Sequence, residues 1–418
     1  MTPAGRAVAE AARDGVAAGV ATNSRRHDLD WLRIAAFALL IGYHVGMLYV
    51  PWAFHVKSEY RGGPVLAAFM LALNPWRLSL LFVISGAATG FMAMRAGRGA
   101  LAWQRSRRLL IPLVFGMLVV VVPQVYFEVV EAGRYSGGFM AFWGRYLHRD
   151  QSFHTPIPTW NHLWFVAYLF VYTLLVVLFA PKPRAVDAAP AEPSRAMLAA
   201  LLVGPWLALW GLRMTLFPRF GSTHAMVGDW YNHAQYFGMF LFGFMLVRRP
   251  ALWLAIDRLR WPALVLAVLG GAVYIGLSLG AFATFAPVEW LRGVGRAGRE
   301  AQAWGAVLAA LGFGQRHLNH DHRWRAYFVE VIFAYYIVHQ TALIALAVWL
   351  KPLQLGGAVE ALLVIAGTVI ACVVTAEVAR RVSWLRPLFG FRGAVPKVNP
   401  PSRPTPSPPA PTSSSRPR

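Results

Sequence analysis

Long apolar runs, separated by short polar segments, dominate the chain from the first of them, which begins near Trp31. Most runs are about 18 to 24 residues long, the length of an α-helix that crosses the hydrocarbon core of a bilayer. We therefore predict an all-α, polytopic transmembrane helical bundle of about ten helices. The predicted spans are 31–50, 77–94, 108–130, 162–180, 196–216, 231–247, 261–281, 301–315, 326–350 and 357–379.

The composition agrees with a membrane protein. Hydrophobic residues make up 57% of the 418-residue chain and charged residues 14%, whereas about 25% of the residues in a soluble protein are charged. The net charge of +22 would suggest nucleic-acid binding in a soluble chain. Here the basic residues lie in short runs between apolar stretches, a pattern that membrane orientation explains. We predict contact with the lipid bilayer and none with nucleic acid.

The placement of Lys and Arg predicts both termini in the cytoplasm. With the N-terminus inside, about two thirds of the 40 Lys and Arg residues fall on the cytoplasmic side. The first segment lacks the compact apolar core of a signal peptide, so we predict a multi-pass protein of the cell (inner, cytoplasmic) membrane. Residues 1–27 and the Pro/Ser-rich residues 393–418 are predicted to be disordered cytoplasmic tails that flank a transmembrane domain of residues 28–392.

Cysteine usage limits the cofactor chemistry. Cys372 is the single cysteine, which excludes an intrachain disulfide and a multi-cysteine metal site. We predict no bound metal and no tightly bound cofactor.

Arg33 and His44 share one face of the first predicted helix. They are 11 residues apart, or about 20° around an α-helix and about 16 Å along it. Asp30 lies close to the same face. Because ionisable groups inside a membrane are costly and often functional, we predict that Arg33 holds the charged end of a long cytoplasmic ligand and that His44 meets its reactive end. Alternatively, Arg33 extends to the interface and His44 hydrogen-bonds a neighbouring helix.

Arg105 and Arg108 precede the third span, on the same predicted side as Arg33. The planar guanidinium group suits phosphate because it forms two parallel hydrogen bonds. We therefore predict that this pair binds the donor; the alternative is a basic anchor that only sets orientation.

Three further segments carry candidate polar residues. Ser85 and Gly86 permit close helix packing in the second span, and a polar role for Ser85 is the alternative. His162 and Trp164 begin the fourth span, where they either contact an acceptor or form part of an interfacial aromatic belt. Glu330 and His339 lie about 180° apart on the ninth span. They therefore cannot both face one site from an unbroken helix.

Five motifs follow one another along the chain. They are Asp30-Trp-Leu-Arg33 with His44, Phe82-Val-Ile-Ser-Gly86, Arg105-x-x-Arg108, His162-Leu-Trp-Phe165, and Glu330 through Tyr336 to His339-Gln340. In this order they resemble the type-3 acyltransferase family of integral-membrane enzymes, and more narrowly its glucans biosynthesis protein C group. Together they cover residues from about 28 to 391.

The resemblance implies ten core helices and an acyl-CoA co-substrate drawn from the cytoplasm. It also implies transfer of an acetyl, succinyl or similar group to a hydroxyl, usually on a sugar, at or beyond the outer face. His44 would be the catalytic histidine, and Arg33, Arg105 and Arg108 would serve activity or donor binding. The supporting candidates are Asp30, Ser85, His162, Trp164, Glu330, Tyr336 and His339.

The chemistry of acyl transfer agrees with these residue types. A neutral imidazole is suited to remove the hydroxyl proton, and the oxyanion of the tetrahedral intermediate needs stabilisation. The sequence leaves open whether His44 acts only as a base or is transiently acylated. The alternative function is a transporter of a glycan or acyl-linked metabolite, although the chain lacks the matching halves common in transporters.

Overall fold

The computed structural model describes residues 26–179, 192–280 and 287–391, and within these ranges it contains helices and no strands. The predicted tails lie outside the described residues, except for residues 26 and 27. The main helices are α2 (His27–Gly46), α3 (Pro64–Arg95), α4 (Arg98–Phe115), α5 (Val122–Glu131), α6 (Phe139–Leu147), α7 (Trp164–Phe179), α8 (Arg195–Thr215), α9 (Phe217–Phe220), α10 (Trp230–Leu246), α11 (Pro250–Ser278), α12 (Val288–His317), α13 (Arg323–Leu350) and α14 (Gly357–Arg381). The shorter turns are η1 (Gly116–Val120), η2 (Gln151–Phe153), η3 (Asn161–Leu163), η4 (Lys351–Leu353) and η5 (Arg386–Phe389).

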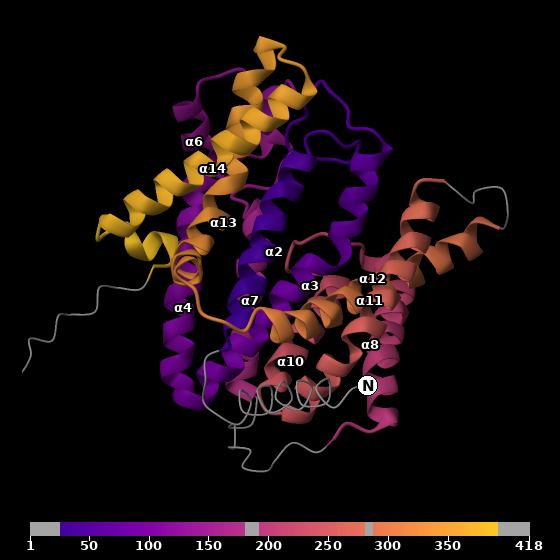
Figure 1. The fold of residues 1–418 in the computed structure, drawn as a ribbon. Coiled ribbons are helices and arrows are strands. Elements are labelled where there is room, and N and C mark those ends of the chain that lie inside the picture. The colour runs from indigo at the N-terminus through magenta and orange to yellow at the C-terminus, as the bar shows by residue number, and fades with distance from the viewer. Residues whose placement is uncertain (1–25, 180–191, 281–286, 392–418) are drawn as a thin grey trace, which may run out of the picture.

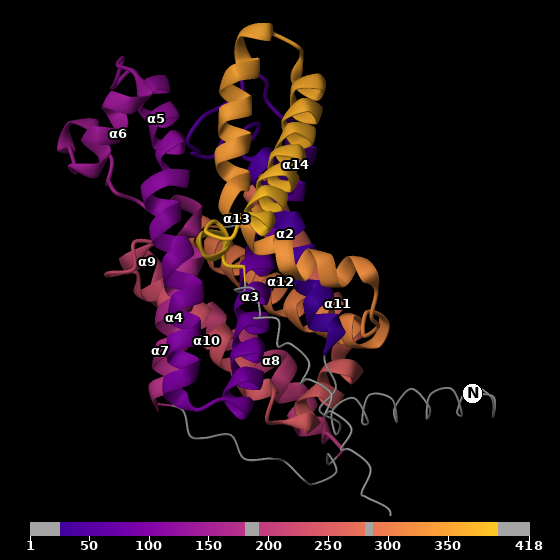
Figure 2. The same ribbon diagram turned by 90° about the vertical axis from the view of Figure 1, so that its left-hand side faces the viewer.

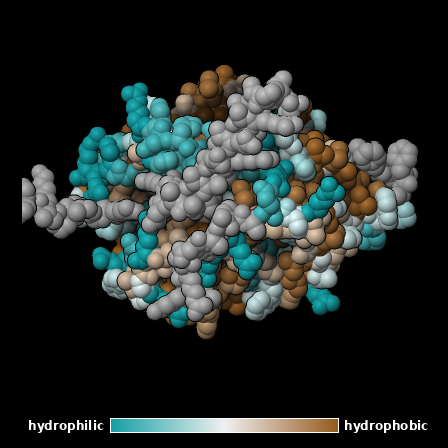
Figure 3. Space-filling model, turned by 60° about the horizontal axis from the view of Figure 1, so that its bottom comes forward, coloured by the Kyte–Doolittle hydropathy of each residue, from teal (hydrophilic) through white to brown (hydrophobic). Residues whose placement is uncertain are grey.

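The helices form an elongated bundle with two distinct ends (Figures 1 and 2). The loop from α2 to α3, α6 and the turn between α13 and α14 lie together at the top of Figure 1. Hydrogen bonds from Gln354 to Glu59 and from the Gly356 backbone to Tyr60 join this loop to this turn. The start of α2 and the turn between α3 and α4 lie toward the other end, where hydrophilic residues cover much of the surface (Figure 3).

Each predicted span overlaps a helix of the structure. In the part of the chain that the structure describes, eight helices are long and apolar enough to cross a membrane. α10 and α12 lie at the other two predicted positions, but α10 has only 17 residues and α12 has a low mean hydropathy. The protein is therefore a multi-pass helical membrane protein, and the count of ten spans stays a prediction.

Apolar side chains on the outside of the bundle agree with a lipid environment. Leu362 and Ile370 on α14 are 66% and 62% exposed, and Val268 and Leu269 on α11 are 60% and 62% exposed. Such contiguous apolar exposure is unusual for a soluble monomer.

Several predicted boundaries were wrong because the helices extend beyond the predicted spans; α3, for example, continues through Asn74 and Pro75, which interrupt its apolar run. The second span was predicted to start at residue 77, but α3 begins at Pro64. The helices at the third and seventh predicted spans, α4 and α11, begin at Arg98 and Pro250, about three turns before the predicted starts. Polar and basic residues at these starts lower the hydropathy without breaking the helix. Arg77 thus lies inside a helix instead of at its edge.

Glycines bring α3 and α10 into direct backbone contact. A Cβ atom on Gly243 would lie 1.9 Å from the carbonyl oxygen of Val83, and one on Gly86 would lie 2.0 Å from that of Phe240. Close approach through small residues is a common way for membrane helices to pack. The packing interpretation of the Ser85–Gly86 segment is therefore confirmed for Gly86.

We expect Gly243→Ala to destabilise the bundle by about 1–3 kcal/mol, because the new methyl group must push two backbones apart. Gly238→Ala is the matched control on the same helix, since nothing lies within 4 Å of its Cβ position. It should be neutral or slightly stabilising, because alanine favours a helix more than glycine does. Thermal unfolding of the two purified variants in one detergent checks this, and equal transition temperatures would contradict the packing described.

Candidate functional site

Three buried or partly buried histidines from three separate elements meet inside the bundle. His44 lies in the last turn of α2, His339 in the middle of α13, and His162 in η3. Nδ1 of His44 lies 2.8 Å from Nε2 of His339, and the planes of these two rings are within 6° of parallel, with their centroids 5.1 Å apart. The ring of His162 meets that of His339 edge-on at 5.1 Å.

Hydrogen bonds fix the tautomers of this pair. Nδ1 of His339 lies 2.7 Å from the carbonyl oxygen of Tyr336. A carbonyl can only accept, so this nitrogen carries the proton and Nε2 of a neutral His339 is an acceptor. His44 must then donate from Nδ1, which leaves its Nε2 unprotonated. Within the described residues no hydrogen bond engages this Nε2, so it is available to a substrate.

His162 is held on both sides of its ring. Its Nε2 lies 3.1 Å from the carbonyl oxygens of Tyr336 and Ile337, and its Nδ1 lies 3.4 Å from Nε2 of Gln124. The Tyr336 hydroxyl donates to the carbonyl of His162. His162 and Tyr336 therefore join η3 to α13 and fix the position of His339.

A buried amide layer continues from His162. Oε1 of Gln124 accepts from Nδ2 of Asn161 at 3.1 Å and from Nε2 of Gln340 at 3.0 Å, and Nε2 of Gln124 donates to the Thr341 hydroxyl at 2.7 Å. Thr341 in turn donates to the carbonyl of Val120 at the end of η1, which is a π-helix. A π-helical turn leaves backbone carbonyls free for such contacts and often occurs at functional sites.

Arg77 is a buried cation beside the histidines that the sequence analysis missed. It is 4% exposed, its Nε and Nη1 make no hydrogen bond, and its Cζ lies 3.4 Å from the centroid of the Tyr43 ring. The Tyr43 ring is 6.1 Å from that of His44. The guanidinium of Arg77 and the imidazole of His44 therefore both lie next to the Tyr43 ring, and they are close enough to interact electrostatically. The signal of Arg77 in the sequence is a lone charge between two apolar stretches, and the predicted span of 77–94 places it at the edge.

The loop after α2 adds a second pair that the sequence did not reveal. Nδ1 of His55 lies 2.5 Å from Oε2 of Glu128 on α5, and the neighbouring Phe54 stacks on His44 at 6.3 Å. Nζ of Lys57 donates to the carbonyls of Met47 and Val50 at 2.6 Å each. Lys57 therefore holds this loop against the end of α2, next to His44.

The predicted donor-binding arginines gather toward the opposite end of α2. Arg33 and Arg108 are both close enough to Arg105 to interact with it electrostatically. Arg105 is 8% exposed and donates to the hydroxyl of Thr89, which itself donates to the carbonyl of Ser85 at 2.8 Å. The structure thus brings the first, second and third predicted motifs together.

Two of the supporting candidates lie in ion pairs instead. Oδ2 of Asp30 accepts from Nη1 of Arg325 at 2.7 Å, which ties the start of α2 to the start of α13. Glu330 is half exposed and lies 3.9 Å from Nη1 of Arg380 on α14. Neither carboxylate is seen in contact with the histidines, and both join neighbouring helices.

Trp164 packs against a loop instead of the histidines. Its ring stacks on His224 with a centroid distance of 4.0 Å, and Trp160 donates to the carbonyl of His224 at 2.9 Å. Burial lowers the pKa of His224 to about 4, so this histidine is neutral near pH 7. Burial opposes ionisation of Asp229, but hydrogen bonds from Tyr168 and Asn232 outweigh it and lower its pKa. The charged Asp229 therefore stabilises the loop before α10 by accepting hydrogen bonds from the backbone of Thr223 and His224.

Among the described residues no cluster of three or more His, Cys, Asp or Glu side chains has the arrangement of a metal site. The geometry instead combines an imidazole with a free nitrogen, a buried guanidinium and a separate arginine cluster. Such a set can remove a proton, stabilise a developing negative charge and hold an anionic ligand.

Comparison with protein families identifies the general class of enzyme. A model described as "Acyltransferase domain" matches residues 26–377 and so includes all five motifs. Comparisons with curated proteins and with solved structures gave no match. The chain belongs to the type-3 acyltransferase family of membrane acyltransferases, as its motifs predicted.

Proposed function

We propose that this protein transfers an acetyl, succinyl or similar acyl group from cytoplasmic acyl-CoA to a hydroxyl of an extracytoplasmic glycan or another surface molecule. The observation that carries the proposal is the free Nε2 of His44, held in one tautomer by His339, on the helix that also bears Arg33. The proposal rests on the predicted orientation, in which both termini and the Arg105–Arg108 segment face the cytoplasm.

The donor is held at its phosphates. The cluster of Arg33, Arg105 and Arg108 supplies several positive charges at one end of α2, and His44 lies about 16 Å further along the same helix. CoA carries its phosphates at one end and its thioester at the other. An extended donor with its phosphates on the arginines therefore presents its thioester to His44.

His44 then acts on the acceptor. Its Nε2 takes the hydroxyl proton while the oxygen attacks the thioester carbonyl carbon. Collapse of the tetrahedral intermediate breaks the C–S bond, and the proton on His44 passes to the leaving thiolate, which leaves as CoA. Arg77 supports this reaction because its Nε and Nη1 are free to stabilise the oxyanion. The accepting Nε2 of His339 stabilises the positive charge that His44 gains.

The acceptor approaches from the loop side of the site. His55 and Glu128 lie next to Phe54, on the side of His44 away from the arginine cluster. Their polar groups suit the hydroxyls of a sugar. The loop that Trp164 and Asp229 hold in place lies on the same side of the bundle.

We expect His44→Gln to lower the rate of transfer by about 10² to 10⁴, because glutamine cannot accept the proton. Acyl-CoA binding should stay within a few-fold of wild type, since the phosphates are held elsewhere. His339→Phe should lower the rate by about 10- to 100-fold, as expected for loss of an orienting partner, and His339→Gln should recover part of it through its carbonyl oxygen. Thiol release from acyl-CoA measures the rate.

His148→Gln is the matched control, because His148 is an exposed histidine at the end of α6. Its rate should lie within two-fold of wild type. Near-normal turnover by folded His44→Gln protein would make His44 a packing residue and would overturn the mechanism.

A second prediction concerns the donor. Arg105→Gln and Arg108→Gln should each weaken acyl-CoA binding by about 10- to 150-fold, the value of a lost charge-assisted hydrogen bond. Arg107→Gln is the control within the same turn, since Arg107 is exposed and lies over the Trp103 ring. Equilibrium binding of acyl-CoA to the purified variants tests this. Equal effects of all three substitutions would reduce the cluster to a topological anchor.

A further inference from the structure

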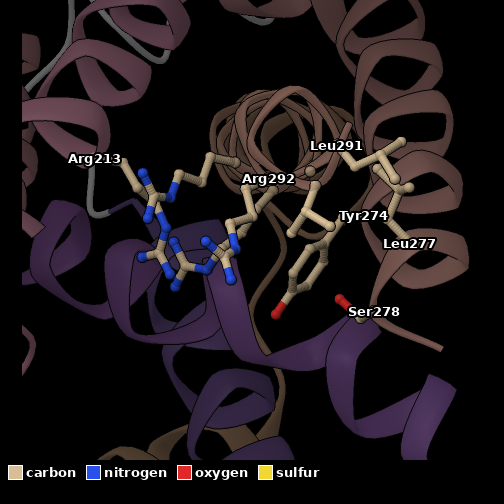
Figure 4. Close-up of a pocket in the computed structure, with 10 residues that line it drawn as sticks. Arg213, Tyr274, Leu277, Ser278, Leu291 and Arg292 are labelled. Carbon is tan, nitrogen blue, oxygen red and sulfur yellow. The ribbon is translucent and has the colours of Figure 1, made fainter. Parts of the chain in front are cut away.

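A cleft lined by four arginines lies between α8, α11 and α12, apart from the histidine site. Its volume is about 360 Å³, and its walls also include Tyr274 and Ser278. Figure 4 shows Arg213 and Arg292 on one side and Tyr274 and Ser278 on the other. Guanidinium and hydroxyl groups are the donors that proteins use to bind oxyanions.

Three of the arginines form a stripe on one helix. Arg292, Arg296 and Arg299 follow one another at intervals of four and three residues on α12, so their side chains share one face. Arg213 enters the same cleft from α8. Like charges at this spacing repel each other, so the stripe weakens the helix unless an anion compensates it.

The carboxylates of the protein compensate only part of this charge. Glu289 pairs with Arg292, and both are largely exposed. Glu300 is buried, pairs with Arg299 and lies 3.6 Å from Nε of Arg213. The contact found for Arg296 within the described chain is a long one, 3.8 Å to Sδ of Met214. Four cations thus face two carboxylates, and the cleft keeps a net positive charge.

The cleft lies toward the same end of the bundle as His44. Gly314 of α12 packs on Leu32, near Arg33, whereas Gln302 donates to the carbonyl of Ala72 near the start of α3. The residues that line the cleft come still earlier in α12 and so lie further toward the His44 end. In the predicted orientation this end is extracytoplasmic. Membrane proteins usually keep Lys and Arg on the cytoplasmic side, so four arginines at this end are not explained by orientation alone.

We propose that this cleft is a binding site for a ligand that carries two or more anionic oxygens on phosphate groups. The spaced guanidinium groups match such a ligand, and the hydroxyls of Tyr274 and Ser278 complete its coordination. Phosphate of this kind comes either from a soluble phosphorylated molecule or from the headgroup of an anionic lipid. Val288 and Leu291 at the wall are compatible with either source.

The test compares two double variants of the full-length protein. Arg292→Gln/Arg296→Gln removes two charges from the cleft, and Arg149→Gln/Arg219→Gln removes two exposed charges outside it. Inorganic pyrophosphate is the soluble probe, titrated calorimetrically into detergent-solubilised protein. Native mass spectrometry of protein from nanodiscs of phosphatidylglycerol or phosphatidylcholine is the lipid probe. Both are repeated in Arg105→Gln/Arg108→Gln protein, so that the arginines near Arg33 do not mask the result.

We expect the cleft variant to bind its ligand at least about 10-fold more weakly than wild type, as for loss of charge-assisted hydrogen bonds, while the control variant is unchanged. Loss of pyrophosphate binding assigns a soluble ligand, and loss of retained phosphatidylglycerol alone assigns a lipid. Arg296→Lys keeps the charge and should retain most of the binding, which separates ligand contact from misfolding. Equal binding of both probes by the cleft and control variants overturns the proposal, and it leaves the proposed acyl transfer untouched.

Discussion

The hydrogen bond between Nδ1 of His44 and Nε2 of His339 is the interaction on which the site depends. His44 is the donor in this bond because Nδ1 of His339 carries the proton of its ring and donates it to the carbonyl oxygen of Tyr336, which leaves Nε2 of His339 as an acceptor. That carbonyl comes from the preceding turn of the same helix, so the regular backbone of α13 sets the tautomer of a residue on α2. The same turn also accepts from His162. The backbone of α13 thus determines that Nε2 of His44 is unprotonated and able to accept a proton.

Burying these polar side chains costs free energy unless each finds a hydrogen-bond partner, so only one arrangement of the side chains is favourable. Polar groups far from water must find partners within the protein, and His162, Gln124 and Asn161 do so through a connected layer of hydrogen bonds. Among the described residues, Nε of Arg105 and both Nε and Nη1 of Arg77 belong to a larger group of buried polar atoms that make no hydrogen bond. Arg105 lies where the donor phosphates are proposed to bind, and Arg77 lies near the proposed position of the oxyanion. An anionic donor and an oxyanion would supply the missing contacts.

Much of the site could be predicted from the sequence because it depends on helix periodicity. Arg33 and His44 share a face of one helix. The predicted topology placed Arg105 and Arg108, just before the third span, on the same side of the membrane as Arg33. Contacts between distant segments could not be predicted. The pairing of His44 with His339, and of His55 with Glu128, depends on how helices pack and how a loop folds over them. Arg77 was missed because Asn74 and Pro75 break the apolar run just before it and suggest a span edge, whereas α3 continues through both residues.

The protonation state of the two histidines tests the central claim most directly. Nitrogen-15 NMR of protein labelled in its histidine rings, with His44→Gln and His339→Gln used for assignment, reports which ring nitrogen carries the proton. The account predicts that at neutral pH both His44 and His339 are neutral and protonated at Nδ1, with Nε2 of His44 unprotonated. A His44 ring protonated at Nε2, or at both nitrogens, would contradict it.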